Sequence, residues 1–316
     1  MNIKKISLPV ITAILIAGCS QELETNSPLA DQSIDKSVEF RSNPFGTISV
    51  SKTSPNGRQI GDPIHVRLVS AEYLTNAENR EMGNTIIFED RGNKQLAFDF
   101  SPFVSLDGTQ EIEYFVDQVR PPQTLDLTAA RQSIIRAANT WKNVSCSNIG
   151  IEKTIDIPVP LGLVAAELGF PSIPGFVAEI NHNGWMPASF FDFLAPNGSQ
   201  GILAVTFTFL VIDNDGEFVD TNSDGKFDVA FREIYYNDNF IWADGGSGVD
   251  TETIALHEMG HGLSQEHFGA AFITKKGDVK FAPRAVMNAA YSGPNRIIKG
   301  TDNAGHCSIW GNWPNN

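Results

Sequence analysis

The stretch "HEMGHGLSQEH", residues 257–267, decides what fold and chemistry this sequence predicts. It holds three of the six histidines in a chain of 316 residues, and a glutamate follows the first of them. A helix is predicted to begin at Asp250, whose carboxylate suits the positive end of a helix dipole. On that helix His257 and His261 are four residues apart, so their rings project from one face and can chelate one metal ion.

The third metal ligand depends on where that helix ends. His267 lies ten residues after His257, which is about 15 Å along a continuous helix. It reaches the same metal only if the helix stops just after His261 and the chain doubles back. Glu266 is an alternative third ligand, but it lies off the face that the two histidines share. Three protein ligands leave one position for water, as a catalytic zinc requires, and Glu258 can reach that water as a general base.

This stretch resembles the metzincin zinc motif H-E-x-x-H-x-x-G-x-x-H, which a methionine turn follows. The matching residues are His257, Glu258, His261 and His267. The glycine of the motif ends the helix in a left-handed conformation, and here Ser264 takes its place. A non-glycine residue in that conformation costs on the order of 1 kcal/mol, which metal coordination could offset.

The segment "RAVMNAAYSG", residues 284–293, resembles the region of the methionine turn. The resemblance implies that Met287 underlies the metal-ligand histidines without binding the metal. Tyr291 follows where the wall of a substrate pocket begins. Some metzincins use a tyrosine two residues after the methionine as a further zinc ligand, but Ala289 occupies that position, so this role is not transferred.

The resemblance covers roughly residues 106–316 and implies an α+β catalytic domain. That domain has a twisted mixed five-stranded sheet, a long first helix over 126–144, the zinc helix and a short closing helix over 299–313. The strand over 201–213 resembles the one that borders the substrate cleft and pairs with an extended peptide. Upstream, runs of β-forming residues over 61–105 predict a small β-rich region that precedes or extends this domain.

The N-terminus predicts export of the protein. Two lysines precede an apolar run over 6–17 that is too short for a comfortable membrane span and has the shape of a secretory signal. The run ends in "IAGC", which resembles a bacterial lipobox and implies a signal peptide over 1–18 and lipidation of Cys19. The alternative is a plain signal peptide with a chance cysteine. Residues 19–60 are rich in Ser, Asn, Pro and charge and predict a flexible tether.

These features predict where the protein acts and with what. We expect a lipid-anchored protein of the bacterial cell envelope, at the outer membrane or cell surface, or an extracellular one. Ser20 after the cysteine favours the outer membrane or surface, by analogy with enterobacterial sorting. The net charge of −14 argues against a nucleic-acid partner. We expect a monomer that contacts the membrane through its lipid only and takes protein or peptide substrates.

Two further cysteines, Cys146 and Cys307, could form one disulfide in an oxidising compartment or stay two buried thiols. The resemblance favours the disulfide, because the first and last helices of that fold lie near each other behind the sheet. Cys146 follows the first helix and Cys307 lies in the last. Apart from Cys19 no cysteine lies upstream, so a cysteine-switch propeptide is not expected. Whether residues 20–105 mask the cleft or are removed stays open.

The segment "DTNSDGKFD", residues 220–228, predicts either a calcium loop or two polar β-turns. Its spacing is that of an EF-hand loop, with Gly225 at the turn position, but Phe231 replaces the bidentate glutamate at the last ligand position. Asp-Gly pairs also explain the segment as turns alone. The candidate calcium ligands are Asp220, Asn222, Asp224, the carbonyl of Lys226, and Asp228.

The sequence therefore predicts an extracytoplasmic zinc endopeptidase. In it, a zinc-activated water attacks a peptide carbonyl, with Glu258 as general base and then general acid. The main alternative is a non-catalytic, calcium-binding surface lipoprotein that binds peptides or glycans, although such a protein has no use for Glu258. A zinc enzyme acting on a non-peptide bond is a third hypothesis, against which the resemblance to a peptide-pairing strand argues.

Overall fold

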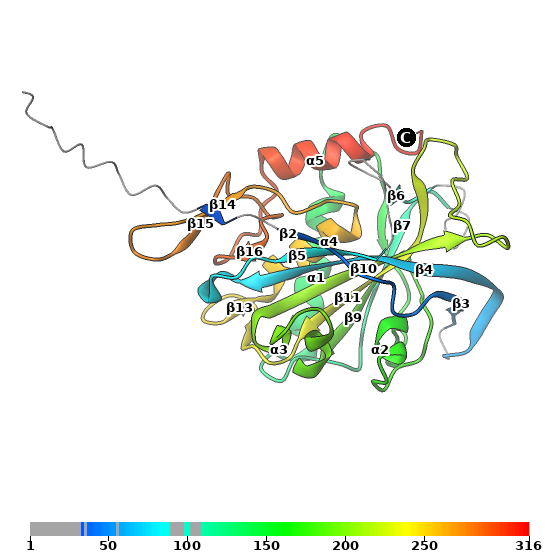
Figure 1. Cartoon of the computed structure of the whole chain (residues 1–316), viewed down its shortest axis with the longest axis horizontal. Helices are drawn as coiled ribbons and strands as arrows, with labels where there is room; N and C mark the ends of the chain where they lie inside the picture. Colours follow the sequence, from blue (N-terminus) through cyan, green and yellow to red (C-terminus); the bar gives the residue numbers. More distant parts are fainter. Residues whose placement is uncertain (1–32, 35–36, 55–56, 89–97, 102–108, 316) are drawn as a thin grey trace, which may run out of the picture. The chain divides into compact units, whose positions relative to one another are not determined.

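A mixed sheet runs through the protein, with helices on both of its faces (Figure 1). The computed structural model describes residues 33–34, 37–54, 57–88, 98–101 and 109–315. The predicted signal peptide, Cys19 and the first part of the predicted tether lie outside the described residues. Gln32–Asn316 form one compact unit. Within the described part of the chain, no helix has the length and apolar character needed to cross a membrane.

The strands nearest the histidine-bearing helix form one side of this sheet. β8 (Ile151–Lys153), β7 (Ile112–Val116), β9 (Ile180–Met186) and β11 (Phe227–Asn237) are neighbours and run parallel. β10 (Ile202–Ile212) pairs with β11 in the antiparallel direction. The strands of such a sheet are nearly continuous apolar runs because helices bury both faces.

The N-terminal strands continue the same sheet. β4 (Gln59–Asn76) pairs antiparallel with β10 along its other edge, and also with β3 (Thr47–Thr53) and β5 (Asn84–Ile87). β2 (Ser37–Phe40) pairs with β5. Among the described residues the sheet therefore has 11 strands, whereas the resemblance implied five. The described strands of the predicted β-rich region over 61–105 extend this sheet, and β4 covers an edge of β10 whose backbone groups would otherwise lack partners.

The remaining elements are short or helical. Their bounds are β1 Ser33–Ile34, β6 Phe98–Asp99, β12 Trp242–Ala243, β13 Val249–Asp250, β14 Ala270–Ile273, β15 Val279–Ala282, β16 Ala290–Tyr291, η1 Ala77–Asn79, η2 Ala188–Phe193, α1 Leu127–Lys142, α2 Leu163–Glu167, α3 Gly198–Gly201, α4 Thr251–Gly262 and α5 Gly300–Trp310. The mixture of sheet and helices is compatible with the predicted α+β class at a coarse level.

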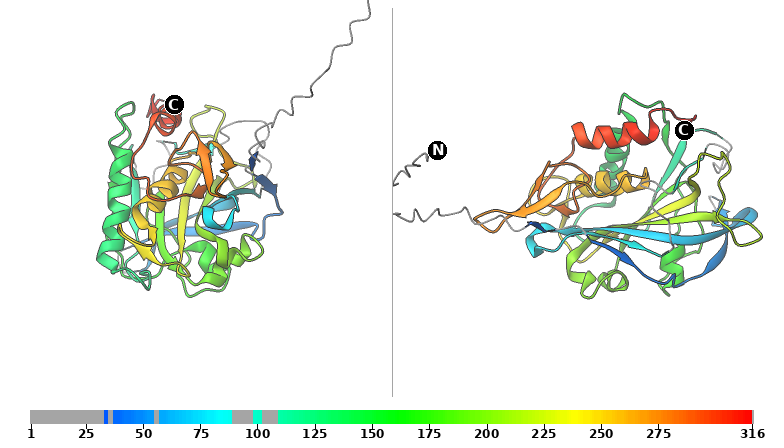
Figure 2. Two further views of the ribbon diagram at one scale, coloured as in Figure 1. Left: turned by 90° about the vertical axis from the view of Figure 1, so that its left-hand side faces the viewer. Right: turned by 45° about the horizontal axis from the view of Figure 1, so that its top comes forward.

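Two hydrophobic cores lie on opposite faces of the sheet. One packs α1, α4 and α5 against it, and Trp141 of α1 donates a hydrogen bond to the carbonyl of Leu256 in α4 at 2.8 Å. Figure 2 shows α4 between the sheet and α5. The other core packs α2 and η2 against the opposite face. The helix that carries two histidines is therefore covered on all sides, which fixes its position.

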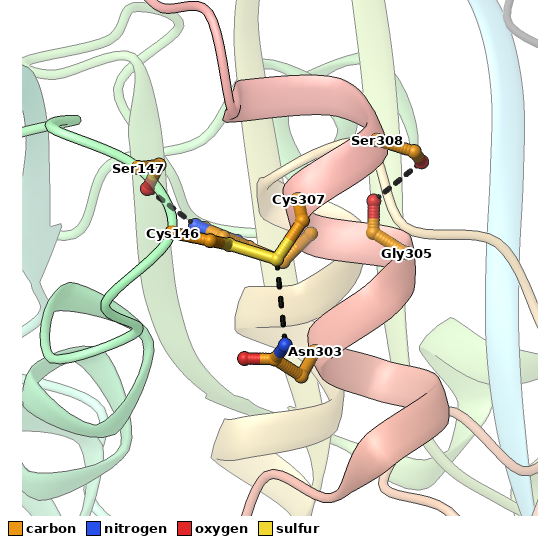
Figure 3. Close-up of a disulfide and its surroundings, with 7 residues drawn as sticks. Cys146, Ser147, Asn303, Gly305, Cys307 and Ser308 are labelled. Carbon is orange, nitrogen blue, oxygen red and sulfur yellow. Dashed lines mark hydrogen bonds between the residues drawn. A yellow bond between two sulfur atoms is a disulfide. The ribbon is translucent and has the colours of Figure 1, made fainter.

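A disulfide joins Cys146, just after α1, to Cys307 in α5 (Figure 3). The predicted pairing is confirmed in the structure. Beside it, the side-chain amide of Asn303 donates to the sulfur of Cys307 at 3.4 Å. The bond therefore ties together two of the helices that cover α4.

Removing this disulfide is expected to destabilise the protein by about 2–5 kcal/mol, because the closed loop constrains the unfolded chain. The cysteines are 161 residues apart, so that loop is long. Urea unfolding of a Cys146→Ser/Cys307→Ser variant under non-reducing conditions measures the loss. Ser308→Ala, an exposed change on the same helix, is the matched control. An unchanged midpoint in the double variant would mean that the bond does not stabilise this fold.

Candidate metal centre

Three histidine side chains converge at the end of α4. The Nε2 atoms of His257 and His261 are 3.0 Å apart, and Nε2 of His267 lies 3.3 Å from that of His257. All three side chains are buried. Among the described residues, they are the one group of histidine, cysteine or acidic side chains close enough to share a metal ion. The structure thus brings the three predicted ligands together and leaves Glu266 outside the group.

The hydrogen bonds of these rings suit a metal. Nδ1 of His257 lies 2.8 Å from the carbonyl oxygen of Val286, and Nδ1 of His261 lies 2.8 Å from that of Gln265. A carbonyl only accepts, so each Nδ1 carries the proton and each Nε2 presents a lone pair. Burial lowers the pKa of His257 to about 4 and that of His261 well below its usual value, which favours neutral rings. Together with His267, these two imidazoles form a group whose nitrogens lie close enough to share one ion, a donor set that suits zinc.

The return of His267 depends on how α4 ends. Ser264 is in the left-handed conformation, with φ of 63°. The N–H of Gln265 donates to the carbonyl of Gly260 at 2.9 Å, and the N–H of Ser264 donates to that of His261 at 3.0 Å. These two bonds form a Schellman motif, which ends a helix and reverses the chain. The predicted helix end just after His261 is therefore confirmed, with serine in the position usually held by glycine.

Glu258 lies buried between α4 and β10. Its Oε2 accepts a hydrogen bond from Oγ1 of Thr206 at 2.7 Å, while its Oε1 is buried without a partner in the protein. Burial raises the pKa of Glu258 well above its usual value; the Thr206 bond opposes this and the carboxylate of Glu72 adds to it. A buried oxygen without a protein partner is expected where a water or a substrate binds.

Met287 is buried in the same hydrophobic core as α4. Its sulfur packs so closely on α4 that a Cβ at Gly260 would clash with it. The backbone N–H of Met287 donates to Asp302 of α5 at 3.1 Å, and that of Val286 donates to the same carboxylate at 3.0 Å. The sequence predicts Asp302 only as a cap of the closing helix, whereas in the structure it also holds the segment whose Val286 carbonyl orients His257.

Tyr291 lines a small cavity beside His257. Its hydroxyl accepts a hydrogen bond from the N–H of Asp250 at 3.1 Å. The cavity measures about 20 Å³, room for about one water molecule, and Leu74 of β4 also lines it. Tyr291 lines a second cavity of about 650 Å³ as well, and its place in a substrate pocket stays a prediction.

The pairing of β10 corrects the expectation that its edge binds an extended peptide. β4 occupies that edge, with Glu72 opposite Thr206 and Leu74 opposite Ala204. β16 in turn pairs with the end of β4. A peptide cannot pair with β10 while β4 stays in place, because each edge of a strand accepts one neighbour. The sequence could not predict this pairing, because the alternation of apolar and polar residues indicates a strand but does not identify its neighbours in the sheet.

Glu72 was also missed in the sequence. Its carboxylate lies 3.5 Å from Nδ1 of His261, and the residue is buried. A charged residue within an apolar strand is a usable signal, because charged side chains are rarely buried without a partner. Glu72 thus adds a second carboxylate beside the histidines.

A larger cavity, of about 560 Å³, adjoins His267 between the turn over 264–268 and α5. Met287 and Asp302 also line it. Its size is within the range of small-molecule sites, about 300–1,000 Å³. It is more spacious than the small cavity beside His257.

Of the predicted calcium ligands, Asp220, Asn222, Asp224 and Lys226 lie in the turns between β10 and β11, and Asp228 lies in β11. The carboxylate of Asp220 accepts from the N–H of Gly225 at 2.9 Å, as in a polar turn. The ammonium of Lys226 lies 3.2 Å from Asp224 and also pairs with Asp99. The structure does not gather these carboxylates into a group that could share an ion. Calcium binding here stays a prediction.

No protein-family model matches the chain, and no curated protein is significantly similar to it.

Proposed function

We propose that the protein is an extracytoplasmic zinc endopeptidase of the metzincin type. The observation that carries this proposal is the convergence of His257, His261 and His267 beside the buried carboxylate of Glu258. The sheet order β8-β7-β9-β11-β10, with β10 alone antiparallel among these strands, supports the resemblance to that fold. The buried Met287, whose sulfur packs on α4 at Gly260, also supports it.

The proposed mechanism assigns separate tasks to these residues. Zinc held by three imidazoles would supply a Lewis acid that polarises a carbonyl and lowers the pKa of a water. The carbonyls of Val286 and Gln265 fix the ring orientations of His257 and His261. Oε1 of Glu258 takes a proton from the attacking water and hands it to the leaving amine. Thr206 keeps the other oxygen of Glu258 in place during both transfers.

One observation favours a second candidate, a zinc hydrolase that acts on a non-peptide bond. β10 has no free edge, so the usual extended binding of a peptide requires β4 to move. The cavity beside His267 is large enough for a compact substrate without such a movement. Both candidates use the same ligands and the same general base, and they differ in the substrate only.

The proposal is tested on the purified protein by metal analysis and by substrate panels. We expect one zinc per chain, and cleavage of casein or of peptides that stops with a chelator and returns with zinc. Hydrolysis of esters or other small amides without peptide cleavage would select the second candidate. Absence of bound zinc, or hydrolysis that a chelator leaves unchanged, would overturn both.

We also infer a bacterial envelope location from the lipobox-like "IAGC". The lipid on Cys19 would be the contact with the membrane, and the zinc domain would face protein or peptide substrates as a monomer. Mass spectrometry of the mature N-terminus tests this inference. A fatty-acylated cysteine is expected there, whereas an unmodified terminus would contradict it.

If β4 limits peptide access, loosening its end is expected to raise peptidase activity. Gly83 donates its N–H to the carbonyl of Ala289 at 2.7 Å, and a Cβ at Gly83 would clash with that oxygen and with the carbonyl oxygen of Tyr73. In Gly83→Ala, we expect the equilibrium between β10 paired with β4 and β10 with a free edge to shift by about 1.4 kcal/mol toward the free edge. Such a shift would raise kcat/KM for peptides roughly tenfold. Hydrogen exchange at the amides of Leu74 and Thr75 reports the loosening independently.

Gly300→Ala is the matched control, because a Cβ there meets no atom within 4 Å. It is expected to leave both exchange and activity unchanged. Faster exchange in Gly83→Ala without a gain in peptide cleavage would show that β4 does not limit access.

A further inference from the structure

Arg232 of β11 is buried, and its guanidinium meets the C-terminal end of α4. Nη1 donates to the carbonyl of Gly262 at 2.6 Å, and Nη2 donates to the hydroxyl of Ser264 at 2.9 Å. Nε donates to Thr208 at 3.1 Å, and the ring of Phe100 lies 4.9 Å from the guanidinium carbon. Burying a guanidinium carries a large desolvation penalty, so its N–H groups need hydrogen-bond acceptors in good geometry.

Burial lowers the pKa of Arg232 to about 10, and the charges of Glu72 and Asp99 oppose this shift. The guanidinium is thus charged at neutral pH, and its hydrogen bonds to Gly262 and Ser264 are charge-assisted. The Gly262 carbonyl is one of the last carbonyls of α4, which have no partner within a helix. One planar side chain therefore binds both the end of the helix and the turn that follows it.

These contacts give a reason for serine at position 264. A left-handed residue with a side chain is strained, and glycine would relieve that strain. Glycine has no hydroxyl, however, and would leave one donor of the buried Arg232 without a partner. The Ser264 hydroxyl offsets the backbone strain by accepting the hydrogen bond from Nη2 of Arg232.

We propose that Arg232 and Ser264 form a clamp that fixes the end of α4 and so positions the zinc ligands. The clamp acts on two of them. Gln265, the next residue, orients His261 through its carbonyl, and His267 follows three residues after Ser264. β11 lies in the middle of the sheet, so the clamp ties the turn to a rigid element. Both are positioning residues, since neither belongs to the group that could hold the metal.

The proposal rests on the proposed zinc site, and its test is zinc affinity measured by chelator competition on the whole protein. Ser264→Ala keeps the strained side chain and removes the acceptor, and Arg232→Met removes the donors. Each is expected to raise the zinc dissociation constant about 10–100-fold, the usual effect of losing support behind a ligand. Ser264→Gly is expected to lose less zinc affinity than Ser264→Ala, because glycine removes the backbone strain together with the hydroxyl.

Thr208→Val is the matched control. It removes the third contact of the same guanidinium but leaves the turn untouched, so it is expected to lower thermal stability and keep zinc affinity. A merely structural role of Arg232 would instead make stability and zinc affinity change together in all four variants. Unchanged zinc affinity in folded Ser264→Ala and Arg232→Met would overturn the clamp.

A second readout separates the clamp from the proposed function. If the wild-type protein binds no zinc, the function fails, and hydrogen exchange at the N–H of Gln265 still tests the clamp. That N–H closes the helix on Gly260, so faster exchange is expected in Arg232→Met than in Thr208→Val. Equal exchange rates in the two variants would overturn the clamp.

Discussion

Replacing Glu258 with glutamine is expected to lower hydrolysis by roughly 10²- to 10⁴-fold, the usual contribution of a general base. Glutamine has the same shape, and its amide oxygen can still accept the hydrogen bond from Thr206 that the carboxylate accepts at 2.7 Å. It cannot take a proton from water. The change therefore removes one chemical task and keeps the packing between α4 and β10.

The measurement is kcat/KM of Glu258→Gln on the best substrate of the panel, together with its zinc content. Zinc content is expected to stay at the wild-type level, because Glu258 is not among the converging ligands. Glu266→Gln is the matched control, since this carboxylate lies in the same segment but outside that group. Wild-type activity in Glu258→Gln would remove Glu258 from the mechanism.

Replacing His267 with alanine is expected to weaken zinc binding more than roughly 100-fold, beyond the effect of losing a supporting residue. The histidine provides one of three nitrogens, and its Nε2 lies 3.3 Å from that of His257. The two imidazole nitrogens left on α4 cannot complete the three-histidine coordination of the zinc. When zinc is limiting, hydrolysis by His267→Ala is expected to fall in step with the fraction of the protein that holds zinc.

Thermal unfolding with and without zinc measures this loss directly. A ligand that binds only the folded state stabilises it by about 2.7 kcal/mol at 100 times its dissociation constant. The wild-type midpoint should therefore rise with zinc, whereas that of His267→Ala should hardly move. His65→Ala, an exposed histidine on β4, is the control and should behave like the wild type. An equal zinc-dependent rise in His267→Ala would exclude His267 as a ligand.

The parts of the fold that local chemistry determines could be predicted from the sequence. Asp250 caps α4 by accepting the N–H of Thr253 at 2.9 Å, and the helix ends before Ser264 as the ligand spacing required. The approach of Cys146 to Cys307 followed from the resemblance to a known fold, since sequence spacing alone allows either a disulfide or two thiols. These features depend on caps, helical periodicity and known topology.

The parts that depend on distant strand pairing could not be predicted. β4 and β10 are separated by more than a hundred residues, and either β4 or a bound peptide would satisfy the same edge. The clamp was missed for a related reason, because Arg232 meets Ser264 only through the tertiary fold. Charged residues that fall within apolar stretches of strands, as at Glu72 and Arg232, are the signal that would have marked both positions as unusual.

X-ray absorption at the zinc edge reports which atoms bind the metal in the purified protein, so it tests the three-histidine zinc site without relying on a substrate. We expect one zinc per chain with three imidazole nitrogens at about 2.0–2.1 Å. In His267→Ala reconstituted at high zinc we expect two such nitrogens. A protein that holds no zinc, or a zinc spectrum without imidazole, would rule out this site.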